Sequence, residues 1–409
     1  MANHSLGCTA ACDVPSHSRL NLSMRILTTL TYYRPHYSGL TIYAERLACA
    51  LAARGHKITV LTSRFNADLP GRERRDGVEI IRPRVWTHIS KGVIMPGMYP
   101  WAWKLARQAD VIHLHLPQLD AAPIALLGRL LKKPVVLTYH CDLLLPAGLV
   151  HRLANFASNI ANTLSAHAAQ RIVTNTRDFA EYSAFLRRYL DKVQIIPPPV
   201  ELPEAGPEDL QAFRQKANVQ PGQRIIGMAA RLASEKGVEY LVQALPMVLE
   251  KHPSARVLFQ GQYQNVLGEE QYAQRMAPLI RSLNERWTFL GNLTPLEMAA
   301  FFRTCEVTVL PSINSTESFG MVQVESIACG TPVIATDLPG VRQPVQMTGM
   351  GLVVPPRDAP ALAQAIISVL ENPNGYRGDR QAVAAHFSPD TVASEYERLF
   401  QGLIHSPGE

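Results

Sequence analysis

The chain has 409 residues, of which 47% are hydrophobic and 18% charged, a composition typical of a globular protein. This length predicts two domains, each able to bury its own core. No run approaches 18 apolar residues, so the sequence predicts no transmembrane helix.

The net charge of +6 is distributed unevenly. Residues 24–199 carry 23 Lys and Arg against 11 Asp and Glu, net +12, whereas residues 200–409 are net −6. Because the first half is basic, an anionic partner is expected there, and membrane headgroups fit; a solvated basic surface is the alternative. No basic motif interleaved with aromatics supports nucleic-acid binding. The cations gather at Arg72, Arg74, Arg75, Arg82, Arg84, Lys132 and Lys133.

The six cysteines are scattered, with no CxxC pair, which favours a reducing compartment such as the cytoplasm, with the inner face of a membrane as a variant. Cys8 and Cys12 have no second ligand pair, so no zinc site is expected there. Residues 1–23 lack the apolar core of a signal peptide and any helix or strand period. We expect a disordered leader, or a start nearer Met24.

A strand over 25–30, a helix over 41–54 and a strand over 57–62 form a βαβ unit at the start of the first half. The loop between the first strand and the helix lies where such folds bind ligands, but it lacks G-x-G-x-x-G. Further along this half, the patterns predict strands over 78–81, 110–115, 134–140 and 171–174 and helices over 121–131, 151–168 and 177–190.

The segment 93–107 combines aromatic and basic side chains. Rings beside cations suit a membrane interface, whereas a helix packed on the sheet explains the same pattern. The side chains concerned are Tyr99, Trp101, Trp103, Lys104 and Arg107.

Three histidines lie on predicted strands of the first half. His113 and His115 alternate along one strand and so share a face, as a metal pair would, but no third ligand accompanies them, and ordinary hydrogen bonding is the alternative. His140 ends the next predicted strand and precedes Asp142, at the edge where parallel sheets place catalytic residues.

The proline-rich segment 194–200 predicts a semi-rigid linker, after which a second α/β half begins. Its predicted strands span 224–230, 255–260, 287–290, 307–311, 333–336 and 351–354, and its predicted helices span 207–217, 238–251, 269–284, 295–303, 319–328, 358–371 and 389–403.

The most informative stretch runs from Glu317 to Pro332. Glu317 precedes the predicted helix and Glu325 lies about two turns into it, roughly 9–12 Å away at 1.5 Å per residue. That gap suits two hydroxyl-rich ends of one long ligand better than a glycosidase carboxylate pair. The free amides between them form an anion site, and Gly320 permits close approach of a phosphate. A nucleotide sugar fits this pattern; a surface helix with solvated glutamates is the alternative.

Arg231 and Lys236 lie on the loop that leaves the strand over 224–230. A guanidinium and an ammonium together suit a diphosphate, although two exposed surface cations are the alternative. No Asp-x-Asp occurs anywhere in the sequence. We therefore expect no metal and no cofactor, with these two cations and a helix N-terminus stabilising the leaving diphosphate.

These motifs resemble the retaining family-4 glycosyltransferases of GT-B fold, and the likeness covers nearly everything from Met24 on. The resemblance implies two Rossmann-like, doubly wound parallel-sheet α/β domains facing across a cleft. An acceptor domain would span 24–198, a nucleotide-sugar donor domain 199–388, and the helix over 389–403 would pack back on the first domain. The motifs are Arg231…Lys236-Gly, Phe289-Leu-Gly-Asn292, Leu310-Pro-Ser312, Glu317-Ser-Phe-Gly…Glu325-Ser-Ile-Ala-Cys-Gly-Thr-Pro and Asp110-Val-Ile-His-Leu-His.

The resemblance also implies catalytic roles. Arg231 and Lys236 would hold the donor diphosphate, Glu317 the hydroxyls of the donor sugar and Glu325 the ribose. His140 would sit near the transferred sugar.

Other roles implied by the resemblance concern binding alone. The donor would also meet Phe319, Gly320, Met321 and Val322 through their amides, together with Gly261, Asn292 and Leu293. Ser38, Gly39 and Asp142 would contact the acceptor or a phosphate.

The activity implied is metal-independent transfer of a hexose from a UDP- or GDP-sugar to a glycan or lipid-linked acceptor, with retention of anomeric configuration. The alternatives are a sugar-nucleotide epimerase, a phosphorylase of the same fold, for which no pyridoxal lysine is evident, or a non-catalytic nucleotide-sugar-binding protein.

Overall fold

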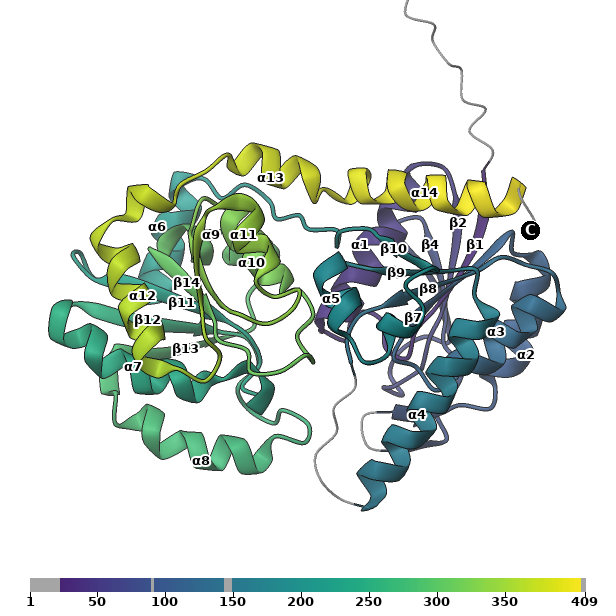
Figure 1. Cartoon of the computed structure of the whole chain (residues 1–409), viewed down its shortest axis with the longest axis horizontal. Coiled ribbons are helices and arrows are strands. Elements are labelled where there is room, and N and C mark those ends of the chain that lie inside the picture. The colour runs from purple at the N-terminus through teal and green to yellow at the C-terminus, as the bar shows by residue number, and fades with distance from the viewer. Residues whose placement is uncertain (1–22, 90–91, 143–148, 406–409) are drawn as a thin grey trace, which may run out of the picture.

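A computed structural model describes residues 23–89, 92–142 and 149–405 (Figure 1). The expected leader over residues 1–23 lies outside this range except for Ser23. The described chain forms two predominantly parallel α/β halves, as the resemblance implied.

The first half contains an eight-stranded sheet in the order β10-β9-β8-β7-β1-β2-β4-β3. Every neighbouring pair is parallel except β3 and β4, which are antiparallel. Strands β5 and β6 pair separately. The bounds are β1 Arg25–Thr29, β2 Lys57–Leu61, β3 Arg72–Arg75, β4 Val78–Ile81, β5 Thr87–Ile89, β6 Gly92–Ile94, β7 Val111–Leu116, β8 Val135–Tyr139, β9 Arg171–Thr174 and β10 Val193–Ile195.

Helices cover both faces of this sheet because successive strand residues point to opposite sides. Ile26 packs with α1 and α14, whereas the next residue, Leu27, packs with α2, α3, α4 and α5. These helices are α1 Gly39–Ala53, α2 Met98–Gln108, α3 Ala121–Leu130, α4 Leu149–Ala168, α5 Arg177–Tyr182 and α14 Pro389–His405.

The second half contains a six-stranded parallel sheet in the order β13-β12-β11-β14-β15-β16. Its strands are β11 Arg224–Ala229, β12 Ala255–Gln260, β13 Trp287–Gly291, β14 Val307–Leu310, β15 Val333–Thr336 and β16 Gly351–Val354. Helices α7, α8 and α12 share one core on one face, and α6, α9, α10 and α11 pack on the other. The helices are α6 Pro207–Lys216, α7 Val238–Lys251, α8 Glu270–Arg281, α9 Pro295–Thr304, α10 Met321–Ala328, α11 Gln343–Thr348, α12 Ala359–Glu371 and α13 Arg380–His386.

The last helix, α14, crosses back onto the first half (Figure 1). Its Tyr396 hydroxyl lies 2.8 Å from the hydroxyl of Tyr43 on α1. Arg54 at the end of α1 binds Glu397 and Asp390 of α14, both at 2.7 Å. The C-terminal helix α14, which follows the second half in the chain, therefore packs into the core of the first half.

The structure corrects several predicted elements. The helix predicted over 177–190 stops at Tyr182, because the Ser183 hydroxyl accepts hydrogen bonds from the amides of Phe185 and Leu186 and turns the chain. Helices α11 and α13 were not predicted, nor was β3, an all-polar edge strand without hydrophobic alternation.

Among the described residues, no helix is both long and apolar enough to cross a bilayer.

Candidate functional site

Two loops of the second half meet at Gly237. This residue has φ +63°, and a Cβ on it would lie 2.1 Å from the carbonyl oxygen of Pro311, so only glycine permits the approach. The amide of Ile313 also donates to the carbonyl of Glu235, at 3.1 Å. As a result Lys236 Nζ lies 2.6 Å from Glu317 Oε2, with both side chains more than four-fifths buried. The structure thus joins two residues that the sequence placed 81 positions apart.

Helix α10 begins four residues after Glu317. It starts at Met321 rather than at Phe319 as predicted, because Gly320 adopts φ +79° and is the N-cap. The amides of Phe319, Gly320, Met321 and Val322 donate to no acceptor within the described part of the chain. Together with the helix dipole, these free amides form a group of donors suited to an anion.

Glu325 lies within α10 and is buried, not solvated. Its Oε1 accepts a hydrogen bond from Nη2 of Arg46 at 2.9 Å. Arg46 comes from α1 in the first half and also donates to the carbonyl of Glu201, at 2.8 Å. Glu325 is therefore oriented by the opposite half of the molecule, which the sequence did not indicate.

Arg231 leaves the end of β11 and is the most open of the predicted site cations, with 40% of its side chain exposed. Its Nη2 donates to Glu235 Oε1 at 3.0 Å. Gly261, at φ +118°, lies against the same turn, since a Cβ there would meet the Ala230 carbonyl at 2.2 Å. Burial and the charge of Arg231 both lower the pKa of His36 in the first half.

His140 directly follows β8 and faces the Glu317 loop. The hydroxyl of Ser318 donates to the His140 carbonyl, joining the two halves. The imidazole Nε2 lies 2.8 Å from Nδ1 of His115, and the two rings stack. Burial lowers the pKa of His140 to about 3, so the ring is neutral near pH 7 and available as a hydrogen-bond partner rather than as a cation.

The pair His113 and His115 shares one face, as predicted, but forms hydrogen bonds. His113 Nε2 lies 2.7 Å from the Thr138 hydroxyl, which in turn lies 2.7 Å from the Tyr396 hydroxyl. Burial lowers the pKa of His113 to about 3. No group of three or more His, Cys, Asp and Glu suited to a metal occurs within the described ranges.

The remaining first-half residues lie at the edges of this region. Ser38 caps α1 through the amide of Thr41, and Gly39 is exposed, with Met321 3.6 Å from where its Cβ would be. Asp142 does not point into open solvent. Its Oδ1 accepts hydrogen bonds from Tyr139, at 2.9 Å, and from Ser183, at 2.6 Å.

Asn292 and Leu293 follow β13. Asn292 is exposed and its side chain makes no hydrogen bond within the described chain, whereas Leu293 packs partly against the α6–α9 core. Within the described chain, neither residue shares a hydrogen bond or an ion pair with Lys236 or Glu317.

A further link between the halves, between α5 and the residue before α11, was also not predicted from the sequence. Arg342, before α11, donates to both carboxylate oxygens of Asp178 on α5, at 2.6 and 2.9 Å. The amide of Gly340 donates to the same carboxylate at 2.8 Å. Burial alone would raise the pKa of Asp178, but these donors lower it. Neither residue belongs to a local motif, so no signal in the sequence identified the pair.

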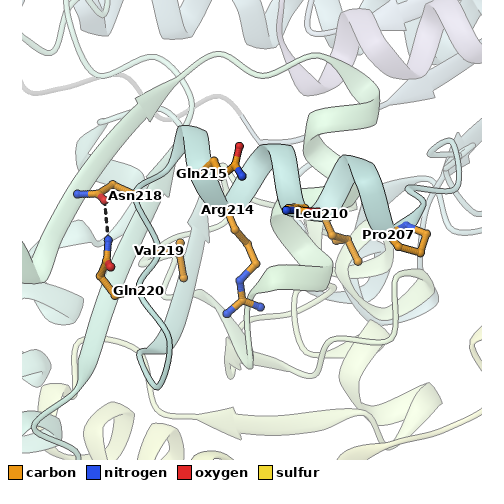
Figure 2. Close-up of a pocket in the computed structure, with 8 residues that line it drawn as sticks. Pro207, Leu210, Arg214, Gln215, Asn218, Val219 and Gln220 are labelled. Carbon is orange, nitrogen blue, oxygen red and sulfur yellow. Dashed lines mark hydrogen bonds between the residues drawn. The ribbon is translucent and has the colours of Figure 1, made fainter.

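A hollow of about 680 Å³ lies elsewhere on the surface, along α6 (Figure 2). Leu210, Arg214 and Val219 line it, and none of the predicted site residues does. It is open to solvent and has one cation, so we do not assign it to the site.

Comparisons with known proteins match both halves of the chain. Residues 38–199 match the model of the glycosyl transferase 4-like domain, and residues 209–384 that of the glycosyl transferases group 1.

Relatives align over most of their length. An uncharacterised glycosyltransferase of Methanocaldococcus jannaschii is 25% identical over 94% of this chain and 100% of its own length. A D-inositol 3-phosphate glycosyltransferase of Pseudarthrobacter chlorophenolicus is 28% identical over 82% of each chain. A phosphatidyl-myo-inositol mannosyltransferase of Mycobacterium leprae is 25% identical over 94% of this chain and 98% of its own.

Solved structures share the fold. Sucrose-phosphate synthase of Thermosynechococcus elongatus superposes with a TM-score of 0.73 at 23% identity, covering 93% of this chain and 99% of that one. HepE of Anabaena, solved with UDP-glucose, gives 0.75 at 19% identity and covers 93% and 100%.

Proposed function

Because this chain belongs to the group 1 glycosyl transferases and is a GT-B glycosyltransferase, we propose that it transfers a hexose from a nucleoside-diphosphate sugar, with retention and without a metal ion. The observation that carries the proposal is the Lys236–Glu317 pair beside the unpaired amides at the start of α10. Cation and amides suit a diphosphate, and the carboxylate suits sugar hydroxyls.

We assign each site residue a role in the transfer reaction from its surroundings in the structure. Lys236, Arg231 and the amides of α10 stabilise charge on the departing diphosphate. Glu317 accepts hydrogen bonds from the sugar, and Glu325 uses its second oxygen, Oε2, for the ribose, since Arg46 holds Oε1. Neutral His140 faces the transferred sugar from the first half.

The identities of the donor and the acceptor are a more specific part of the proposal. The UDP-glucose complex of HepE supports a UDP-hexose, and the mannosyltransferase relative supports mannose as the transferred hexose. We propose a glycan or lipid-linked acceptor. The names of the relatives indicate that inositol phosphates and phosphatidylinositol should be among the acceptors tested.

The test is a transfer screen with purified protein, UDP- and GDP-hexoses and this acceptor set, followed by NMR of the product anomer. Glu317→Ala should lose transfer at least about 100-fold, as expected for a group that acts in the transition state. Glu297→Ala, on α9 outside the site, is the matched control and should retain it.

Donor turnover without acceptor would instead favour an epimerase. Donor binding with no turnover across the whole panel would favour a non-catalytic binding protein. Full transfer by Glu317→Ala would refute the proposed site.

A further inference from the structure

Helices α2, α3 and α4 cover the same face of the first sheet. Their inward residues, such as Ala102, Ile124 and Ala166, belong to one core with Leu27 of β1. Helix α3 lies in contact with both α2 and α4. In Figure 1 the three helices lie on the side of the sheet away from α14. We call their outward surface, across the described side chains of α2, α3 and residues 156–168 of α4, the three-helix face.

Large apolar side chains follow one row along each of these helices. They recur every four residues, a spacing that places them on one side of a helix. Two of them are mostly exposed, Leu130 at 72% and Phe156 at 65%. A single exposed apolar residue needs no explanation, but rows on three adjacent helices mark an interaction surface. The rows are Phe156, Ile160 and Leu164 on α4, Leu126 and Leu130 on α3, and Tyr99 and Trp103 on α2.

The charge of the three-helix face has one sign. None of the three helices contains Asp or Glu, whereas Lys104, Arg107 and Arg129 lie exposed among the apolar rows. The two carboxylates that flank the helices are engaged: Asp110 binds Arg25 and Asp120 accepts from Tyr99.

The cations that cluster in sequence near Arg72 lie elsewhere, and three of the five arginines between positions 72 and 84 form ion pairs. Arg82 binds Glu73 at 2.6 Å, and Arg72 donates through Nε to Glu79 at 2.7 Å. The cluster near Arg72 is therefore interspersed with carboxylates, whereas helices α2, α3 and α4 contain none, which makes the three-helix face the better candidate.

We propose that the three-helix face docks on an anionic lipid bilayer. Aliphatic and aromatic side chains enter the interface while the surrounding cations meet the headgroups, a combination that suits a bilayer. Nucleic acid fits less well, because four of the seven side chains in the rows are Leu or Ile, which do not stack on bases. This inference rests on the surface alone and is independent of the sugar chemistry.

The test is flotation of the full chain with phosphatidylcholine vesicles, with and without phosphatidylglycerol. We expect preferential binding to the anionic vesicles, weakened by salt because the attraction extends only over a Debye length. The variant Phe156→Gln/Ile160→Gln/Leu164→Gln should lose binding at least about tenfold. Glutamine keeps helix propensity, and the removed side chains are exposed, so folding is preserved.

The matched control is Leu279→Gln/Leu296→Gln, exposed leucines of α8 and α9 in the other half, which should bind like the unmodified protein. Lys104→Glu/Arg107→Glu provides a second variant and should lose binding to anionic vesicles only. Equal binding to both vesicle types, no binding, or unchanged binding by both variants would overturn the proposal. So would sedimentation velocity showing a dimer that the glutamine variant dissociates, because a second copy would then be the partner.

Discussion

Replacing Lys236 by Ala tests the site most directly. The ammonium lies 2.6 Å from Glu317, and the two side chains are only 17% and 16% exposed. Loss of one partner leaves a mostly buried carboxylate without its charged hydrogen bond, which costs about 1–3 kcal/mol of stability. If Lys236 also stabilises the leaving diphosphate, kcat should fall by about 10²–10³, as for loss of a preorganised transition-state donor.

The chain offers a matched control in Lys216, which lies 2.5 Å from Glu297 in the same half. That pair has side chains 56% and 29% exposed, so Lys216→Ala should cost about 1 kcal/mol or less. It should also leave transfer unchanged.

The assay combines initial rates over a range of donor concentrations with urea unfolding of Lys236→Ala, Lys236→Arg and Lys216→Ala. Partial rescue of kcat by Lys236→Arg would support an electrostatic role. If Lys236→Ala kept kcat within threefold while losing stability, the pair would be structural and the reasoning would be wrong.

Three further outcomes are expected. Glu325→Gln should raise donor KM more than it lowers kcat, because it weakens nucleoside binding and its pairing with Arg46; an unchanged KM in donor saturation curves would count against that role. His140→Ala should lower transfer about tenfold or more, while the acid limb of the pH–rate profile of the unmodified enzyme should show no group near pH 6.5, since His140 is already neutral there. Burial lowers the pKa values of His113, His115 and His140, so the unfolded state binds more protons below about pH 6.5 and stability should fall from pH 7.5 to pH 5; equal urea unfolding at both would contradict this.

Local sequence patterns predicted most of the strands and helices of the fold. Strands such as Val111–Leu116 and Val135–Tyr139 are apolar runs bounded by turns, and parallel sheets bury such strands on both faces. Gly320 was expected from the sequence to permit the close approach of a phosphate, and only the structure shows that it and Gly237 adopt the positive φ angles that favour glycine. The sequence alone therefore predicted where Lys236 and Glu317 lie in their elements.

Only the tertiary structure decided which distant residues meet. Arg46 binds Glu325 and Asp178 binds Arg342 across the two halves, at separations of 279 and 164 residues. Nothing in the spacing of either partner encodes such a contact, because periodicity reports the face of one element and not its neighbour. The same limit explains the charges. Cations adjacent in sequence near Arg72 are partly paired with carboxylates, whereas three successive helices, α2, α3 and α4, pack side by side and form the three-helix face.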